Sequence, residues 1–81
     1  METPASDLHL ERVDATRNMA RFYRLSVAPT LFGDVALVRE WGRIGTLGRR
    51  RLDLYVDERS ARNALAILSE AKVKRGYRHL G

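Results

Sequence analysis

The first half of the chain alternates apolar and polar residues with a period of two, which is typical of half-buried β-strands. Leu8 and Leu10, for example, alternate with His9 and Glu11. The same alternation predicts four strands, over Leu8–Val13, Met19–Ala28, Val35–Trp41 and 50–56.

The period also indicates which side chains share a face of each strand. In the second strand, Tyr23, Leu25 and Val27 share one face. In the fourth strand, one face carries Leu52, Leu54 and Val56. The other face carries Arg51, Asp53 and Tyr55.

Turn-forming residues separate the strands. Pro29 and Gly33 predict a loop before the third strand. Gly45 and Gly48 lie between the third and fourth strands and can take the positive φ that a short hairpin loop requires.

After Val56 the period changes to that of an amphipathic helix over 57–76. Asp57 is a good N-cap, and Gly76 stands where a helix commonly ends in the left-handed conformation. The apolar positions of this helix are Ala61, Ala64, Leu65, Leu68 and Ala71. Residues 77–80 form a short final strand or tail. We therefore predict an α+β fold, a small antiparallel sheet of four to five strands with one helix on one face.

Length and composition limit the possibilities further. The chain has 81 residues and no cysteine, so we predict a single domain over 1–81, with a disordered tail over about residues 1–7. The absence of cysteine excludes a disulfide framework, and the acidic N-terminal segment is unlike a signal peptide. No apolar run approaches the roughly 18 residues of a membrane span. We expect a cytoplasmic protein with no membrane association.

The positive charge is unevenly distributed. The net charge is +5, but residues 1–40 carry five basic and six acidic residues, whereas residues 41–81 carry ten basic and four acidic ones. A one-sided basic field favours polyanionic partners, above all nucleic acid. The alternative is that the excess charge only keeps the domain soluble.

Enzymatic chemistry has little support in the sequence. His9 and His79 have no neighbouring groups at metal-ligand spacing, and no nucleophile elbow, carboxylate pair or phosphate-binding motif is present. We predict no catalytic residues, no metal and no cofactor. Two G-x-x-G matches, over 42–45 and 45–48, lie between strands and not between helices, so they only weakly indicate a KH-type loop.

Trp41 is the single tryptophan, and a lone tryptophan in a small domain is usually part of the core. Strand alternation places Arg39, Trp41 and Arg43 on one face. This face passes from apolar residues to arginine, which predicts that the indole lies at the edge of the core and can stack on a base or sugar. We interpret Gly42 as clearing the gap between Trp41 and Arg43.

Further cations follow Trp41 along the chain. Arg49, Arg50 and Arg51 come after the turn, and strand alternation would direct Arg50 away from the other two. Arginine suits bidentate contact with phosphate. A solvated strand end is the alternative for each of them.

The stretch from Glu40 to Tyr77 closely resembles the WGR domain, named for the motif that Trp41, Gly42 and Arg43 form here. Its usual W-G-R-I-G start and K-x-K-x-G-Y-like end match "WGRIG" and "KVKRGY". The family occurs in poly(ADP-ribose) polymerases and in bacterial proteins. The resemblance implies a nucleic-acid-binding module in which Trp41 stacks on the sugar or base of a terminal nucleotide. It further implies that Arg43 reaches the terminal phosphate or a neighbouring surface, with Tyr77 assisting.

We therefore predict a non-enzymatic module that binds DNA through sugar-phosphate contacts and prefers ends or nicks. A protein-interaction module using the same face, or an RNA or single-strand binder, is the alternative. The sequence leaves the oligomeric state open. The predicted nucleic-acid-binding residues are Trp41, Gly42, Arg43, Arg39, Arg49, Arg50, Lys72, Lys74 and Tyr77.

Overall fold

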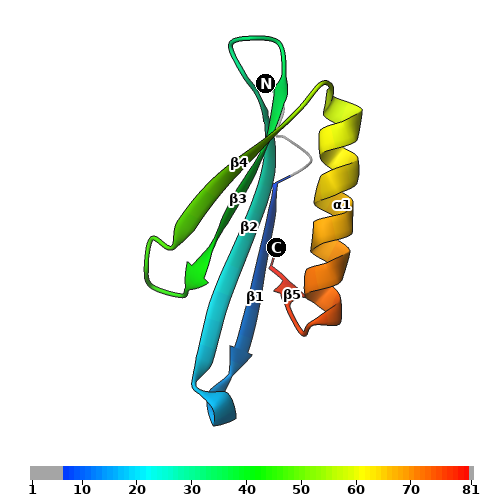
Figure 1. Ribbon diagram of the computed structural model, residues 1–81. Coiled ribbons are helices and arrows are strands. Elements are labelled where there is room, and N and C mark those ends of the chain that lie inside the picture. The colour runs from blue at the N-terminus through cyan, green and yellow to red at the C-terminus, as the bar shows by residue number, and fades with distance from the viewer. Residues whose placement is uncertain (1–6, 81) are drawn as a thin grey trace.

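The computed structural model describes residues 7–80. The predicted tail over residues 1–7 therefore lies outside the described residues, apart from Asp7. Within residues 7–80, five strands and one α-helix follow each other (Figure 1). The elements are β1 (Leu8–Asp14), a short 3-10 helix (Ala15–Arg17), β2 (Met19–Pro29), β3 (Val35–Arg43), β4 (Arg49–Tyr55), α1 (Glu58–Lys74) and β5 (Arg78–His79).

The strands form one antiparallel sheet in the order β4-β3-β2-β1-β5. Each of the first four strands pairs with its neighbour in sequence, whereas β5 returns after α1 to pair with β1. The predicted α+β architecture is confirmed, and the final segment is a short strand. Gly45 and Gly48 have φ of 95° and 72° in the β3–β4 loop, as predicted.

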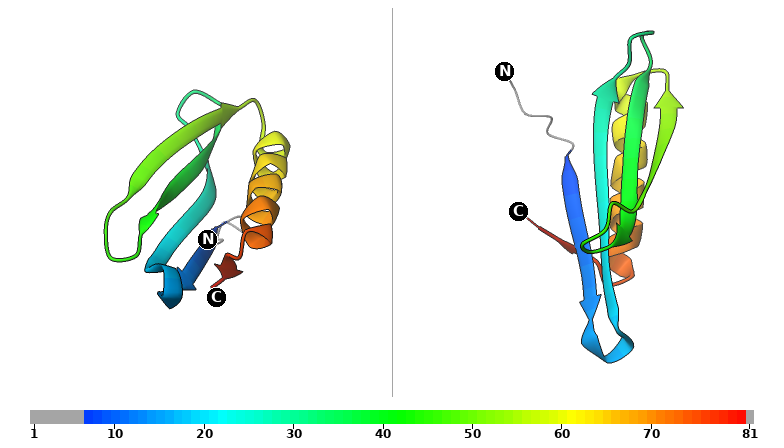
Figure 2. Two further views of the ribbon diagram at one scale, coloured as in Figure 1. Left: turned by 60° about the horizontal axis from the view of Figure 1, so that its bottom comes forward. Right: turned by 90° about the vertical axis from the view of Figure 1, so that its left-hand side faces the viewer.

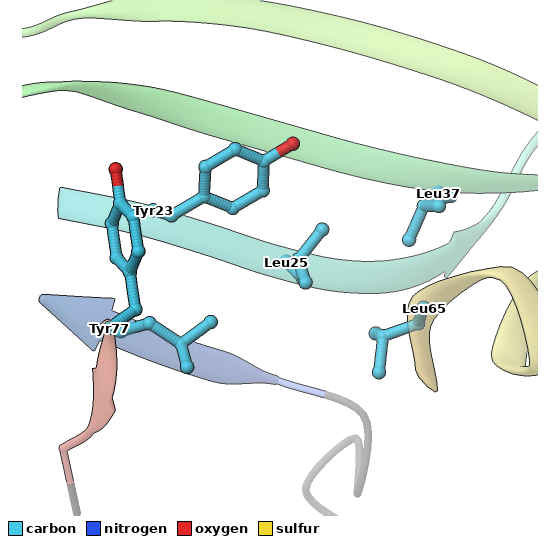
Figure 3. Close-up of a cluster of buried hydrophobic side chains, with 6 residues drawn as sticks. Tyr23, Leu25, Leu37, Leu65 and Tyr77 are labelled. Carbon is cyan, nitrogen blue, oxygen red and sulfur yellow. The ribbon is translucent and has the colours of Figure 1, made fainter. Parts of the chain in front are cut away.

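One face of the sheet is covered by α1, which packs against β2, β3 and β4 (Figures 1 and 2). Apolar side chains from the sheet, the helix and the segment after the helix meet there, and Figure 3 shows this cluster. The buried cluster consists of Leu10, Tyr23, Leu25, Leu37, Leu65 and Tyr77.

Both ends of α1 are closed by the residues that the sequence predicts. The carboxylate of Asp57 accepts a hydrogen bond from the backbone N–H of Ser60 at 2.8 Å. At the other end, Gly76 takes φ of 99°. The N–H of Gly76 donates to the carbonyl of Val73 at 3.0 Å, and that of Tyr77 to the carbonyl of Lys72 at 3.1 Å. This Schellman pattern ends the helix and turns the chain back toward the sheet.

The inward-facing stripe of α1 differs from the prediction near its C-terminal end. Ala71 was expected in the stripe but is exposed, and the half-buried residue is Lys72. The buried positions Ala61, Leu65 and Ser69 follow a spacing of four. Continuing this row by one further turn reaches position 72, because residues three or four apart share a helix face.

The alternation in β4 is confirmed, but its leucines lie on the side of the sheet away from α1. Asp53 is opposite the buried Leu37 in the β3–β4 register, so Asp53 and Tyr55 are on the face that α1 covers. Leu52 and Leu54 are on the other face, where their exposed fractions are 55% and 61%.

The molecule is elongated, with extents of 45 × 24 × 23 Å. The β1–β2 hairpin continues well beyond the C-terminal end of α1 (Figures 1 and 2). The face of the sheet at that end is therefore not covered by the helix. In the part of the chain that the structure describes, no helix is long and apolar enough to cross a membrane.

Candidate nucleic-acid interface

Three aromatic rings meet where α1 ends. Trp41 on β3 lies opposite Tyr23 on β2, and their ring centroids are 5.9 Å apart with an angle of 17° between the planes. Tyr77 meets Tyr23 edge-on, at 6.4 Å and 81°. Tyr23 and Tyr77 are buried, whereas Trp41 is half-buried against the core. The predicted position of the indole at the edge of the core is confirmed.

Arg39 contacts two of these rings, Tyr23 and Trp41. Its Nε donates to the hydroxyl of Tyr23 at 3.0 Å, and its guanidinium donates to Asp53 at 3.1 Å. Its Cζ lies 5.7 Å from the centroid of the Trp41 ring. Burial works against its charge, but the bonds to Tyr23 and Asp53 outweigh burial and raise the pKa of Arg39. Since Asp53 balances its charge, Arg39 positions Trp41 and Tyr23 and is not a free cation.

Lys72 extends from α1 over the same rings. Its Nζ lies 4.4 Å from the centroid of Tyr23 and 5.4 Å from that of Tyr77. Burial, followed by the positive charges of Arg75, Arg39 and Arg21, lowers the pKa of Lys72. Within residues 7–80, Lys72 takes part in no ion pair. An ammonium that lacks an acidic partner and lies near other cations is well suited to bind an anion, because the anion would offset the repulsion between these positive charges.

A row of arginines crosses the sheet beyond Lys72. Arg12 on β1 lies opposite Arg21 on β2, and Arg21 lies opposite Arg43 on β3. Arg43 donates to the backbone carbonyl and the side-chain oxygen of Asn18, at 3.3 and 3.4 Å. Like charges directly opposite each other on neighbouring strands are destabilising. An anionic ligand would relieve this repulsion.

Arg12 and Arg21 were missed at the sequence level. A signal for Arg21 was present, because Arg21 is two residues before Tyr23 and strand alternation places both on one face. Arg12 could be found only from the β1–β2 register, which aligns it with Arg21.

A pocket of about 290 Å³ opens among these side chains. Its walls combine aromatic rings with cations that have no acidic partner within residues 7–80. Such an arrangement can accept a sugar or base on the rings and phosphate oxygens on the cations. The residues that line it are Arg21, Phe22, Tyr23, Trp41, Gly42, Arg43, Lys72 and Tyr77.

The role of Gly42 differs from the predicted one. A Cβ at position 42 would point to the side of the sheet away from Trp41 and Arg43, where it would lie 2.7 Å from Cα of Gly48. A Cβ at Gly48 would in turn come within 2.2 Å of the Trp41 carbonyl oxygen and 2.8 Å of the Phe22 ring. Gly42 and Gly48 therefore allow the hairpin loop to close tightly over Phe22.

The remaining predicted residues are not all at the pocket. Arg49 lies opposite Trp41 in the register, on the same face, and is exposed. Arg50 lies opposite Glu40, on the other face. Lys74 is exposed on α1 and lines a separate hollow with Ser69 and His79. The structure thus brings Trp41, Gly42, Arg43, Lys72 and Tyr77 together at the pocket. Arg39 contacts Tyr23 and Trp41 but does not line the pocket, and Arg49 lies opposite Trp41 on the same face of the sheet.

Metal chemistry finds no support at this surface or elsewhere within residues 7–80, where no three histidine, aspartate or glutamate side chains converge. His9 lies 3.5 Å from Glu11 on the outer face of β1.

Comparison with known proteins identifies the family to which this chain belongs. The family model of the WGR domain matches residues 6–81. An uncharacterized protein of Sinorhizobium fredii, y4dW, is 48% identical over 71 residues, which are 88% of this chain. The chain spans only 35% of the length of that relative. No solved structure matches the chain significantly. WGR domains are non-catalytic modules of the nucleic-acid-binding type, found in poly(ADP-ribose) polymerases and bacterial proteins, and this chain belongs to that family.

Proposed function

We propose that this chain is a non-enzymatic module that binds DNA in the cytoplasm through sugar-phosphate contacts and prefers ends or nicks. The observation that carries the proposal is the pocket in which Trp41, Tyr23 and Tyr77 lie next to three cations, Arg21, Arg43 and Lys72. None of these cations has an acidic partner among residues 7–80. The rings offer stacking surface, and the cations offer partners for phosphate.

The preference for ends follows from what such a pocket can reach. Inside a duplex, each base pair is stacked on both sides and the sugars are flanked by continuous backbone. At an end or a nick, a terminal nucleotide exposes its sugar and one face of its base, which an aromatic ring can cover. Stacking of this kind contributes about 1–3 kcal/mol per base. Phosphate contacts by the surrounding cations add affinity without reading sequence.

The proposal can be tested with DNA that differs only in its ends. We suggest fluorescence anisotropy at low ionic strength with a duplex closed by a hairpin loop at both ends, the same closed duplex with one nick, and an open blunt duplex. The nicked and blunt forms should bind more tightly than the closed form. Equal affinity for all three would contradict the preference for ends, and absence of binding to any of them would contradict DNA binding.

The same assay separates the alternatives. Single-stranded DNA and an RNA duplex of equal length serve as competitors for the nicked probe. If either competes better than duplex DNA, the pocket serves a single strand or RNA instead.

Substitution of Trp41 tests the stacking surface itself. Trp41→Ala should weaken binding to the nicked duplex by about 1–3 kcal/mol, while circular dichroism shows a folded protein. Phe32→Ala is the matched control, because Phe32 is 90% exposed in the loop between β2 and β3 and lines no part of the pocket. If Trp41→Ala unfolds the protein, or binds as well as the wild type, the ring has only a structural role.

A further inference from the structure

The strand β4 forms one edge of the sheet and has a neighbour on only one side, β3, among residues 7–80. Half of its backbone N–H and C=O groups therefore face outward without a strand to pair with. Edge strands of this kind readily pair with another strand. The identity of that strand is indicated by the sequence of β4 itself.

The charges of β4 are arranged with opposite signs at its two ends. Arg49, Arg50 and Arg51 occupy the first three positions, and Asp53 follows near the far end. Within one chain, Asp53 already accepts hydrogen bonds from Arg51 at 2.9 Å and from Arg39 at 3.1 Å. If two copies of β4 pair antiparallel around Leu52, Arg51 of each copy also lies opposite Asp53 of the other, so that guanidinium groups of both chains share the two carboxylates. Opposite charges that face each other across two strands are stabilising, and like charges are destabilising.

Other arrangements are less favourable. A register centred on Arg51 sets the two copies of Arg51 against each other, and one centred on Asp53 does the same with two carboxylates. Parallel in-register pairing would set all three arginines against their own copies. Only the register centred on Leu52 also places Arg49 opposite Tyr55, where a guanidinium can contact an aromatic ring.

The apolar residues of β4 fit the same register. Leu52 and Leu54 are more than half exposed on the side of the sheet that α1 leaves uncovered. Around Leu52, the two copies of Leu52 meet each other, and each Leu54 lies next to the aliphatic stem of Arg50 from the other copy. Lys and Arg stems cover apolar surface while their charged ends remain in water.

We propose that a second copy of this chain is the partner of β4, and that two sheets join through antiparallel β4–β4 pairing centred on Leu52. The two five-stranded sheets become one ten-stranded sheet. The two-fold axis runs perpendicular to the sheet, so both helices and both Trp41 pockets lie on the same side. With strand spacing and rise as in ordinary sheets, the two Trp41 residues lie about 25 Å apart.

This pairing does not depend on nucleic-acid binding and can fail or hold independently of it. If both hold, one dimer presents two pockets on one surface and can hold two DNA ends, or the two sides of one break.

The absence of cysteine from the chain makes a direct test possible. In Leu52→Cys, the two thiols of a dimer lie opposite each other. Opposite residues in an antiparallel pair have Cα atoms about 4.5–5.5 Å apart, a distance that a disulfide can span. Mild oxidation should convert most of this variant to a covalent dimer. Leu47→Cys, in the β3–β4 loop and 95% exposed, should form far less.

Two further variants test the register. Arg50→Cys and Leu54→Cys should each form little covalent dimer when oxidised alone, and should form a covalent mixed dimer when combined. Rapid self-dimerisation of Arg50→Cys would place the centre at position 50 and overturn the proposed register.

Sedimentation or light scattering of the unmodified protein completes the test. The wild type should show a concentration-dependent dimer without any disulfide, and Leu52→Lys should shift it to the monomer while remaining folded by circular dichroism. A wild type that stays monomeric at millimolar concentration, or a Leu52→Cys that oxidises no faster than Leu47→Cys, would overturn the proposal.

Discussion

Lys72 is the residue at which the helix and the sheet form the candidate site together. It belongs to the inward stripe of α1, and its ammonium lies over Tyr23 and Tyr77. Sequence reasoning selected Lys72 as one of several cations in the last turn, beside Lys74. It could not single out Lys72, because the predicted apolar stripe ended at Ala71 and did not include position 72.

The two lysines provide a matched pair of substitutions. Lys72→Gln should weaken DNA binding and reduce the steepness of its salt dependence by about 1, because one phosphate contact is lost. Lys74→Gln removes the same charge from a position outside the pocket, so its effect should be small. Anisotropy titrations at several salt concentrations measure both quantities. Equal losses for the two variants would show that only overall charge matters.

The ends of the strands and of the helix were predictable to within a few residues, because the apolar residues of each element recur with a clear period. The period does not reveal which face of a strand is covered. In β4 the sequence pattern allows either face to be the covered one, because leucines lie on one face and Asp53 and Tyr55 on the other. Asp53 is placed inward because Arg39, itself held against Tyr23, needs a carboxylate partner. That requirement exists only once β2, β3 and β4 are aligned.

Gly48 in the β3–β4 loop is needed for two separate reasons, which can be measured apart. Gly33, in the loop between β2 and β3, has positive φ as Gly48 does, but a Cβ at Gly33 would meet nothing within 4 Å. Gly33→Ala should therefore lose only about 1 kcal/mol of stability through backbone strain. Gly48→Ala adds contact with the Trp41 carbonyl and the Phe22 ring, and should lose about 1–3 kcal/mol more. Urea denaturation of both variants tests this difference, which equal losses would contradict.

The N-terminal cap of α1 predicts a pH dependence of stability. Hydrogen bonds from Ser60 lower the pKa of Asp57 below its ordinary value of 3.8. A carboxylate whose pKa is lower in the folded than in the unfolded state stabilises the fold above the unfolded pKa. This contribution is lost as the pH falls through the folded pKa.

Asp57→Ser isolates this effect, because serine also caps a helix but does not titrate. The melting temperature of the wild type should fall more steeply between neutral pH and about pH 3 than that of Asp57→Ser. Asp57→Ala should be less stable than Asp57→Ser throughout, through loss of the cap. Parallel melting curves for wild type and Asp57→Ser across the range would argue against a titrating cap.

At the scale of the whole molecule, the charge is concentrated where the sheet is uncovered. Arg12, Arg21 and Arg43 cross the sheet there, with Lys72 above them and Arg49 on the same face. The sequence located the excess charge in the second half of the chain. It did not show that Arg12 and Arg21, from the first half, join the same surface, since that follows from the register of the sheet.

This surface predicts a defined salt dependence of DNA binding. If three to five of these cations each neutralise one phosphate, the logarithm of the affinity should fall with the logarithm of the salt concentration at a slope of roughly −3 to −5. Titrations of the nicked duplex over a range of potassium chloride concentrations measure the slope. A slope shallower than about −1 would show that phosphate contacts contribute little.

The Schellman end of α1 at Gly76 fixes the length of the helix relative to the sheet. One additional turn would lengthen the helix by about 5.4 Å and extend it beyond Gly76, which lies beside Arg12, so that it would cover part of the sheet surface that holds the arginine row. One turn fewer would remove Lys72 and expose Tyr23 to water. The number of residues between Asp57 and Gly76 therefore determines the size of ligand that the sheet can admit. Insertions or deletions in this helix should change ligand selectivity even where every residue of the pocket is retained.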